Sequence, residues 1–125
     1  MNTPAYFELQ ADDPSEAAAF YSAVFGWQIA RDGAAPIDYW RIATAGIGGA
    51  ILKRPAPSPP PASGTNAAVV SIEVADYDAT AEAIHRHGGR DALPKFAVPG
   101  RCWQGYFIDP AGNTFGVFQV DPAAA

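Results

Sequence analysis

Tyr6-Phe7-Glu8-Leu9, which runs through a polar turn to Asp13, decides the fold because the chain repeats it. Ser71-Ile72-Glu73-Val74 runs through a polar turn to Asp78, and a helix-like pattern follows each of these aspartates. One offset of 65 residues superimposes the two segments. Such self-similarity predicts an internal duplication of a strand–turn–helix unit. A duplicated unit places equivalent residues face to face, so we expect a symmetric cleft suited to a ligand.

The residues that follow the first strand complete one βαβββ module. Asp13 starts a helix with Pro14 at its first position, and Gly26 ends the helix. Three short strand candidates come next, separated by glycine and proline; they span residues 27–31, 39–44 and 49–53. We place this first module at residues 4–53.

The second module repeats this order over residues 67–120. It is predicted to have strands at 68–75, 101–108 and 114–120, a weak edge strand at 90–93, and a helix from Asp78 to His87 capped by Asp78. A tight turn at 109–113 joins its last two strands. Residues 54–66, rich in Pro, Ala and Ser, predict a semi-rigid connector, and residues 121–125 a frayed tail. The expected fold class is α+β, with both modules in a single domain over residues 1–125.

Composition and charge exclude several classes of function. Nearly half of the 125 residues are apolar, but no apolar run approaches the roughly 20 residues of a membrane span. The net charge is −5 and the basic residues are scattered, which argues against nucleic acid as a partner. Without a secretory pattern at its start, the chain is expected to be cytoplasmic. Its one cysteine, Cys102, allows no internal disulfide and no thiolate metal cluster.

Several motifs along the chain belong together. They are the opening strand, Asp12-Asp13-Pro14, Phe20-Tyr21, Phe25-Gly26-Trp27, Gly48-Gly49 and Asp109-Pro110-Ala111-Gly112-Asn113. In combination they resemble the vicinal oxygen chelate superfamily, which includes glyoxalase I, bleomycin resistance proteins and extradiol dioxygenases. The Phe-Gly-Trp motif and the closing residues 115–119 are most similar to the glyoxalase-like subgroup. The resemblance implies two βαβββ modules whose mixed sheet curls around one cleft with the helices outside, and it implies a homodimer.

The same resemblance implies where a metalloenzyme of this family would bind its divalent ion. The ligands come from the first and the last strand of each module, and here three of these positions hold Tyr6, Ser71 and Gly116. The last strand of the first module, within residues 46–53, has no His, Asp, Glu or Cys. A divalent ion needs several converging donors, so we predict no metal ligands and no cofactor. The two histidines, His85 and His87, lie two residues apart at a helix end, which favours a capping or solvent role.

Two glutamates are candidate catalytic residues. If Phe7 packs on the helix, alternation turns Glu8 into the cleft, and the offset places Glu73 there as well. Mutual repulsion and burial would raise the pKa of at least one of them, and such a pair can exchange protons with a substrate. The alternative is that each glutamate is merely held by a backbone amide or by an arginine, Arg41 or Arg101.

Aromatic side chains on the strands, with a few polar groups among them, predict a pocket for a flat or amphipathic molecule. The alternative is that these aromatics form plain core. The predicted loop 94–100 could act as a lid, with Lys95 or Arg101 contacting an anionic group of a ligand. The alternative is an ordinary surface loop. The predicted ligand-binding residues are Tyr6, Trp40, Ser71, Trp103, Tyr106, Gly116, Phe118, Lys95 and Arg101.

We therefore expect a glyoxalase/bleomycin-resistance-like protein with a degenerate metal site that binds a small aromatic or amphipathic molecule. An alternative is a lyase or isomerase of the glyoxalase family, with Glu8 and Glu73 as acid and base or with an atypical divalent metal site. A third is an interaction module that uses the proline-rich connector or a sheet edge.

Overall fold

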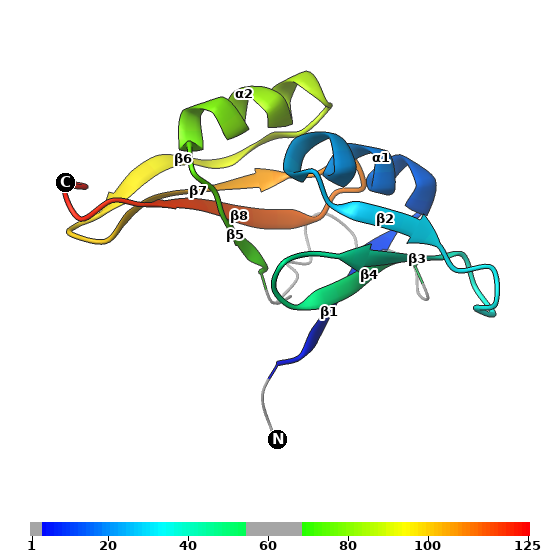
Figure 1. Cartoon of the computed structure of the whole chain (residues 1–125). Helices are drawn as coiled ribbons and strands as arrows, with labels where there is room; N and C mark the ends of the chain where they lie inside the picture. Colours follow the sequence, from blue (N-terminus) through cyan, green and yellow to red (C-terminus); the bar gives the residue numbers. More distant parts are fainter. Residues whose placement is uncertain (1–3, 55–68) are drawn as a thin grey trace. The chain divides into compact units, whose positions relative to one another are not determined.

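Each half of the chain folds as a strand, a helix and three further strands, as drawn in Figure 1. The computed structural model describes residues 4–54 and 69–125, and the chain divides into two units, Met1–Thr65 and Asn66–Ala125. The predicted α+β fold of two tandem βαβββ modules is confirmed. Apart from Arg54, the predicted connector lies outside the described residues.

The first unit is a four-stranded mixed sheet in the order β1-β4-β3-β2 with one helix. β1 and β4 run parallel, and the other neighbouring strands pair antiparallel. A parallel pair needs a crossover, which the helix and the two intervening strands supply. The elements are β1 (Tyr6–Ala11), α1 (Pro14–Phe25), β2 (Gln28–Arg31), β3 (Tyr39–Ala43) and β4 (Gly48–Lys53).

Both ends of α1 follow the local signals that the sequence contains. The Asp13 carboxylate accepts hydrogen bonds from the backbone N–H groups of Ser15 (3.1 Å) and Glu16 (3.4 Å), and Pro14 occupies the first turn. Gly26 ends the helix with φ +70°, a left-handed conformation that glycine adopts without strain, and its N–H donates to Ser22. The predicted start and end of this helix are therefore confirmed.

The Phe-Gly-Trp motif places an aromatic cluster between α1 and its sheet. The turn at Gly26 brings Trp27 back over the helix, where its ring stacks on Tyr21 at 5.3 Å between centroids. Trp27 also lies 5.4 Å from the ring of Phe25 and 5.7 Å from that of Phe7 on β1. Phe7 therefore faces the helix, and alternation turns its neighbours on β1 to the other side of the sheet.

The second unit repeats the topology with the strand order β5-β8-β7-β6. Again the first and last strands pair in parallel and the others antiparallel. Its turn at 109–113 is held by Asp109, which is only 3% exposed and accepts from the N–H groups of Ala111 and Asn113, each at 2.9 Å. The elements are β5 (Ser71–Glu73), α2 (Tyr77–Arg86), β6 (Arg90–Val98), β7 (Cys102–Ile108) and β8 (Thr114–Val120).

Two local predictions for this unit are wrong. The cap of α2 is Asp76, whose carboxylate accepts from the N–H of Ala79 at 3.0 Å, and Asp78 lies in the first turn. The cap of α2 thus lies two residues before the position that the 65-residue offset predicts. The predicted edge strand also continues through Pro94 to Val98, so most of the predicted lid loop is strand. An edge strand tolerates proline, and the register of β6 against β7 shifts on either side of it.

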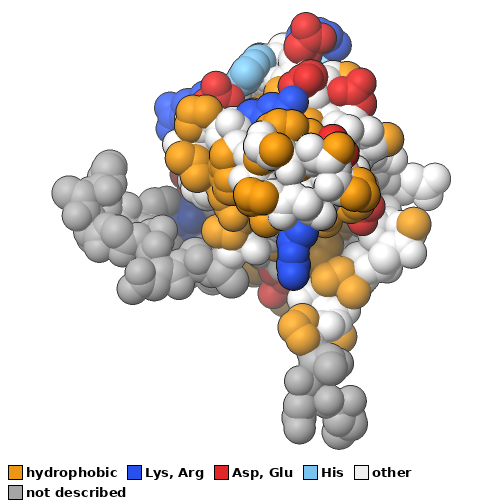
Figure 2. Space-filling view, turned by 90° about the vertical axis from the view of Figure 1, so that its left-hand side faces the viewer, with side chains coloured by type: hydrophobic (Ala, Val, Ile, Leu, Met, Phe, Trp, Pro, Cys, Tyr) orange, Lys and Arg blue, Asp and Glu red, His pale blue; other side chains and the backbone are white. Residues whose placement is uncertain are grey.

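The predicted frayed tail is also wrong, because the last residues pack on the β6–β7 turn. Ala124 is 3% exposed, and its carbonyl accepts from the N–H of Gly100 at 2.9 Å. Asp121 donates its N–H to the Arg101 carbonyl at 2.9 Å. Figure 2 looks onto the end of the unit that carries the C-terminus: hydrophobic side chains cover much of it, with charged ones above them toward α2.

The close approach of neighbouring atoms explains a glycine in each sheet. A Cβ on Gly49 would lie 2.6 Å from the carbonyl oxygen of Phe7, and one on Gly105 would collide with the hydroxyl of Tyr77. Tyr77 is the first residue of α2, so Gly105 lets this helix approach its sheet. Within the described residues, no helix has both the length and the apolar character needed to cross a membrane.

Candidate functional site

Each unit has one sheet face that its own helix does not cover. In the first unit, this helix-free face is defined by the register of its strands and lies opposite Phe7, Trp27 and the helix. Tyr6 lies beside Gly48 across the parallel pair, and the next row across the sheet runs Glu8, Ala50, Arg41 and Ala30. The predicted orientation of Tyr6 and Glu8, away from the helix, agrees with this register.

A chain of three hydrogen-bonding groups lies on this face. The Tyr39 hydroxyl donates to Oε2 of Glu8 at 2.9 Å, and the hydroxyl oxygens of Tyr39 and Tyr6 are 2.9 Å apart. Because Tyr39 has one hydroxyl hydrogen and gives it to the carboxylate, Tyr6 must supply the hydrogen between the two phenols. The link to Tyr6, partial burial and the Glu8 carboxylate together raise the pKa of Tyr39 well above its usual value.

Arg41 does not hold Glu8, although the sequence left that possibility open. Its guanidinium Nε binds Oδ2 of Asp32 at 3.0 Å and lies over the ring of Tyr39, 5.3 Å from the centroid. Hydrogen bonds from the Ala34 backbone N–H and from Arg41 lower the pKa of Asp32. The Asp32 carboxylate in turn raises the pKa of Arg41. The partner of Glu8 is thus a phenol.

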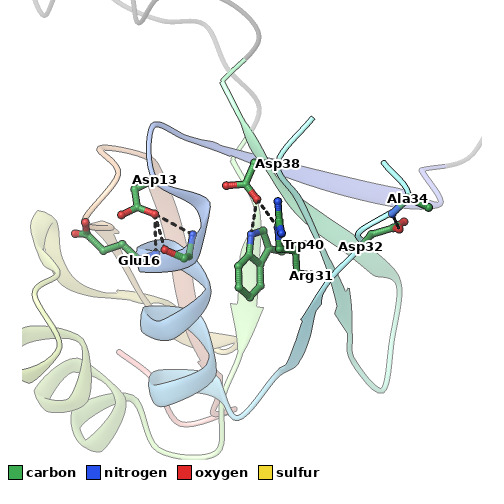
Figure 3. Close-up of polar contacts among 8 residues, drawn as sticks. Asp13, Glu16, Arg31, Asp32, Ala34, Asp38 and Trp40 are labelled. Carbon is green, nitrogen blue, oxygen red and sulfur yellow. Dashed lines mark hydrogen bonds and ion pairs between the residues drawn. The ribbon is translucent and has the colours of Figure 1, made fainter. Parts of the chain in front are cut away.

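Trp40, a predicted ligand-binding residue, lies on the opposite face of this sheet. It pairs with Ile51, on the face toward the helix. Figure 3 shows its indole N–H donating to Oδ1 of Asp38 at 2.9 Å, and Arg31 reaches the same oxygen at 3.3 Å. This contact anchors the end of β3 and is separated from the Tyr6–Glu8 group by the sheet.

The helix-free face of the second unit combines aromatic and polar side chains in two rows. One row runs Ser71, Gly116, Tyr106 and Leu93, and the other runs Glu73, Phe118, Gln104 and Phe96. The rings of Phe96 and Tyr106 stack with centroids 6.4 Å apart. Five predicted site residues therefore share this face: Ser71, Glu73, Tyr106, Gly116 and Phe118.

Gly116 is covered by its neighbours. A Cβ at this position would collide with the Ser71 hydroxyl and would lie 3.0 Å from Nε2 of Gln104. The space that a side chain at 116 would fill is thus occupied by a hydroxyl and an amide. In the first unit, Gly48 has its nearest side-chain neighbour in Tyr6, at 4.0 Å from the position of a Cβ.

Lys95 and Trp103 meet on the helix side of the second sheet. Lys95 binds Asp78 on α2 at 3.0 Å, and its ammonium lies 4.9 Å from the ring centroid of Trp103 and 5.3 Å from that of Tyr77. The Trp103 indole donates to Asp121 at 2.9 Å. Burial, with the charges of Asp91 and Asp78, raises the pKa of Tyr77. These contacts join β6, β7 and α2.

The remaining charged candidates lie at the edges of the second unit. Arg101 is exposed in the turn before β7. His85 pairs with Asp91 at 2.7 Å, and His87 is the C-cap of α2. Within residues 4–54 and 69–125, no three His, Cys, Asp or Glu side chains cluster closely enough to hold a metal ion.

Sequence reasoning missed three residues of these faces. Tyr39 lies two residues before Arg41 on the same strand, so alternation alone places both side chains on one face of the sheet. That alternation could have indicated Tyr39 as a residue of this face. Gln104 and Phe96 lie in one row with Phe118. Alternation along β7 places Gln104 with Tyr106, but Phe96 could not be placed once β6 was ended before Pro94.

Comparisons with known proteins agree with this architecture. Residues 3–117 match the Glyoxalase/Bleomycin resistance protein/Dioxygenase superfamily. The chain is 29% identical over 123 residues to the "Putative glyoxylase CFP32" of Mycobacterium bovis and of Mycobacterium tuberculosis. The match covers 97% of this chain and 47% of those proteins, so the chain spans about half the length of the curated relatives it matches.

Solved structures share the fold at low identity. A glyoxalase/bleomycin resistance protein/dioxygenase family enzyme from Burkholderia phytofirmans superposes with a TM-score of 0.77 at 17% identity, covering 94% of this chain and 98% of that one. The fosfomycin resistance protein FosX from Listeria monocytogenes, complexed with Mn(II) and 1S,2S-dihydroxypropylphosphonic acid, superposes with a TM-score of 0.76 at 14% identity. This superposition covers 97% of this chain and 94% of that one. The topology and the family match over most of the sequence agree, and the chain belongs to the glyoxalase/bleomycin resistance protein/dioxygenase superfamily.

Proposed function

We propose that this protein binds a small aromatic or amphipathic molecule on the helix-free faces of its sheets, without a metal ion. One observation carries the proposal. In each unit, the last strand places a glycine beside the first-strand position from which the family's metalloenzymes bind their ion: Gly48 pairs with Tyr6, and Gly116 pairs with Ser71.

The residues present do not fit a divalent ion. Glycine has no side-chain donor, a serine hydroxyl is a weak ligand, and the phenol of Tyr6 is engaged with Tyr39. A carboxylate at position 116 would require the Ser71 hydroxyl, which lies against the position of a new Cβ, to move away. We therefore assign the chemistry of these faces to hydrogen bonding and apolar contact.

The second unit supplies the apolar part of the proposed site. The rings of Tyr106, Phe96 and Phe118 lie on one face with the hydroxyl of Ser71 and the amide of Gln104. Aromatic walls with a few polar groups suit a flat organic molecule, which they contact through ring faces while the polar groups fix its orientation.

A second candidate is enzymatic. The relatives named putative glyoxylases favour it, and so does the hydrogen bond that fixes Glu8 to Tyr39. In that case Glu8 and Glu73 would move protons for a lyase or isomerase, or an atypical ion would be bound. Consumption of the hemithioacetal of methylglyoxal and glutathione, measured with and without added zinc, nickel or manganese, tests this candidate.

The experiment for the proposed function is a thermal-shift and calorimetric screen of aromatic antibiotics, glutathione conjugates and aromatic metabolites. Metal analysis of protein purified without a histidine tag runs beside it. We expect at least one aromatic ligand to raise the unfolding temperature and no stoichiometric metal to co-purify. A stoichiometric divalent ion, or a screen with no stabilising ligand, would overturn the proposal.

Variants locate the binding surface. Tyr106→Ala and Phe118→Ala should weaken the best ligand by roughly three- to thirtyfold, because each removes an aromatic contact. Ile37→Ala is the matched control: Ile37 is 44% exposed and lies in the loop between β2 and β3. Circular dichroism shows whether each variant is folded. Equal loss of affinity in the control would place the binding surface elsewhere.

A further inference from the structure

The polarity of the Tyr6–Tyr39–Glu8 chain determines what it can recognise. Tyr6 gives its hydroxyl hydrogen to Tyr39, and Tyr39 gives its own to Oε2 of Glu8. Both phenol hydrogens are therefore used inside the chain. What remains for a ligand at the ends of this chain is the pair of lone pairs on the Tyr6 hydroxyl oxygen and Oε1 of Glu8, and both atoms are hydrogen-bond acceptors.

The charge of this group is negative and unpaired. Among the described residues, no lysine, arginine or histidine forms an ion pair with Glu8. The nearest cation in the sheet row, Arg41, is neutralised by Asp32 at 3.0 Å. The phenol bond at 2.9 Å fixes the carboxylate without neutralising it. The chain as a whole has a net charge of −5, which also attracts cations.

The neighbouring surface has room for an organic group. Tyr6 is 44% exposed. Its partner on β4 is Gly48, which has no side chain, and the partner of Glu8 is Ala50, which has only a methyl group, so neither covers the tyrosine ring. An aromatic ring beside a carboxylate is a favourable environment for an ammonium group, which contacts the ring face and donates to the oxygens.

We propose that Tyr6 and Glu8, positioned by Tyr39, bind a protonated primary or secondary amine of an organic ligand. The inference rests on the proposed function and adds to it the chemical class of the ligand at the first unit. A quaternary ammonium, which has no hydrogen to donate, binds less well. A carboxylate or phosphate binds least, because the Glu8 carboxylate repels it and both phenol hydrogens are already used.

The test compares three probes of similar size and different charge: phenethylamine as the cation, 2-phenylethanol as the neutral molecule and phenylacetate as the anion. Calorimetry or NMR titration measures each affinity at neutral pH. We expect phenethylamine to bind roughly three- to tenfold more tightly than the alcohol, as for a partly exposed charge pair, and phenylacetate to bind least. The amide signals that shift should be those of β1 and β3.

Variants separate charge from position. Glu8→Gln keeps the shape of the side chain and should abolish the preference for the amine. Tyr39→Phe removes the hydroxyl to which Tyr6 donates, so the Tyr6 hydroxyl becomes free to donate to a ligand. This variant should bind phenylacetate less weakly, relative to the alcohol, than the wild type does. Glu82→Gln on the exposed side of α2 removes the same charge elsewhere and should leave the three affinities unchanged.

Each outcome decides the inference. Equal affinities for the three probes, an unchanged preference in Glu8→Gln, or signal shifts confined to the second unit would overturn it and leave the proposed function standing. If none of the three probes binds, the inference fails, and the wider screen of aromatic ligands judges the proposed function separately.

Discussion

The two units have the same strand order but differ in what their helix-free faces present. In the first, Tyr6, Tyr39 and Glu8 form a hydrogen-bond chain that ends in a charge. In the second, the equivalent positions Ser71 and Glu73 share their face with aromatic rings and an amide. The comparison shows that duplication preserved the backbone pairing, while the chemistry of each face depends on a few side chains.

The largest expected effect comes from the glycines that permit close packing in each sheet. Gly49→Ala should lower the free energy of unfolding by about 3 kcal/mol, because the new Cβ meets the backbone oxygen of Phe7, which cannot rotate away. Gly105→Ala should cost about 1–2 kcal/mol, because the tip of Tyr77 can shift.

Urea unfolding measures both glycine variants, with Gly33→Ala as the control, since no atom lies within 4 Å of a Cβ placed there. The control should change stability by less than about 0.5 kcal/mol. A larger loss for Gly105→Ala than for Gly49→Ala would show that the Tyr77 side chain yields less to a new Cβ than the β1 backbone at Phe7 does.

The turns before β4 and β8 are equivalent in topology and differ in burial. Asp109→Ala should cost about 2 kcal/mol, because it removes a buried carboxylate that accepts from the partly buried N–H groups of Ala111 and Asn113. Thr44→Ala should cost about 0.5–1 kcal/mol, because its bonds to Gly46 and Ile47 are exposed to water. Thermal and urea unfolding of both variants give the ranking, and equal losses would contradict the burial argument.

The cations of the two units contact aromatic rings in different surroundings. Lys95→Met should lower stability by about 1 kcal/mol, because the ammonium lies over Tyr77 and Trp103 and binds Asp78. Arg41→Met should have a smaller effect, because Arg41 is more exposed. Urea unfolding compares the two variants, and a larger loss for Arg41→Met would reverse this ranking.

The smallest effect is a pH dependence in the first unit. Hydrogen bonds from Ser15, then from Glu16, lower the pKa of Asp13 below its reference value of 3.8. The folded state therefore gains stability from the ionised carboxylate above that value and loses it as the pH falls through the folded pKa. Asp13→Asn keeps a good N-cap but has no carboxylate, so it should be less stable than the wild type at neutral pH. Below pH 3.8 the wild type loses this stabilisation, and the difference between the two proteins should shrink.

Unfolding of the wild type and Asp13→Asn between neutral and acidic pH measures this difference. Asp32, whose pKa is lowered by Ala34 and Arg41, should behave in the same way when replaced by asparagine. A gap between wild type and variant that widens in acid would contradict the direction of both shifts.

Features with a local cause could be predicted from the sequence. The cap at Asp13, the left-handed Gly26 and the turn begun by Asp109 each depend on residues a few positions apart, and the structure has all three. The opposite orientations of Phe7 and Glu8 could also be predicted, because successive side chains of a strand point to opposite faces of its sheet.

Features that depend on distant pairing could not be predicted. Continuation of β6 beyond Pro94 requires the partner strand β7, and the packing of Ala124 requires the β6–β7 turn. The Tyr6–Tyr39 bond joins residues 33 positions apart, so no local pattern indicates it. The cap of α2 at Asp76 lies two residues before the position given by the 65-residue offset, on which the prediction of an Asp78 cap depended.

Pro94 has a consequence for strand pairing between chains. β6 is the outermost strand of its sheet, and seven of its nine residues are exposed, including Leu93 at 48%. Such a border could recruit a strand from another chain and start fibril growth. The missing amide of proline and the irregular pairing on either side of it interrupt that template, so we expect Pro94 to hinder the addition of a foreign strand along this edge.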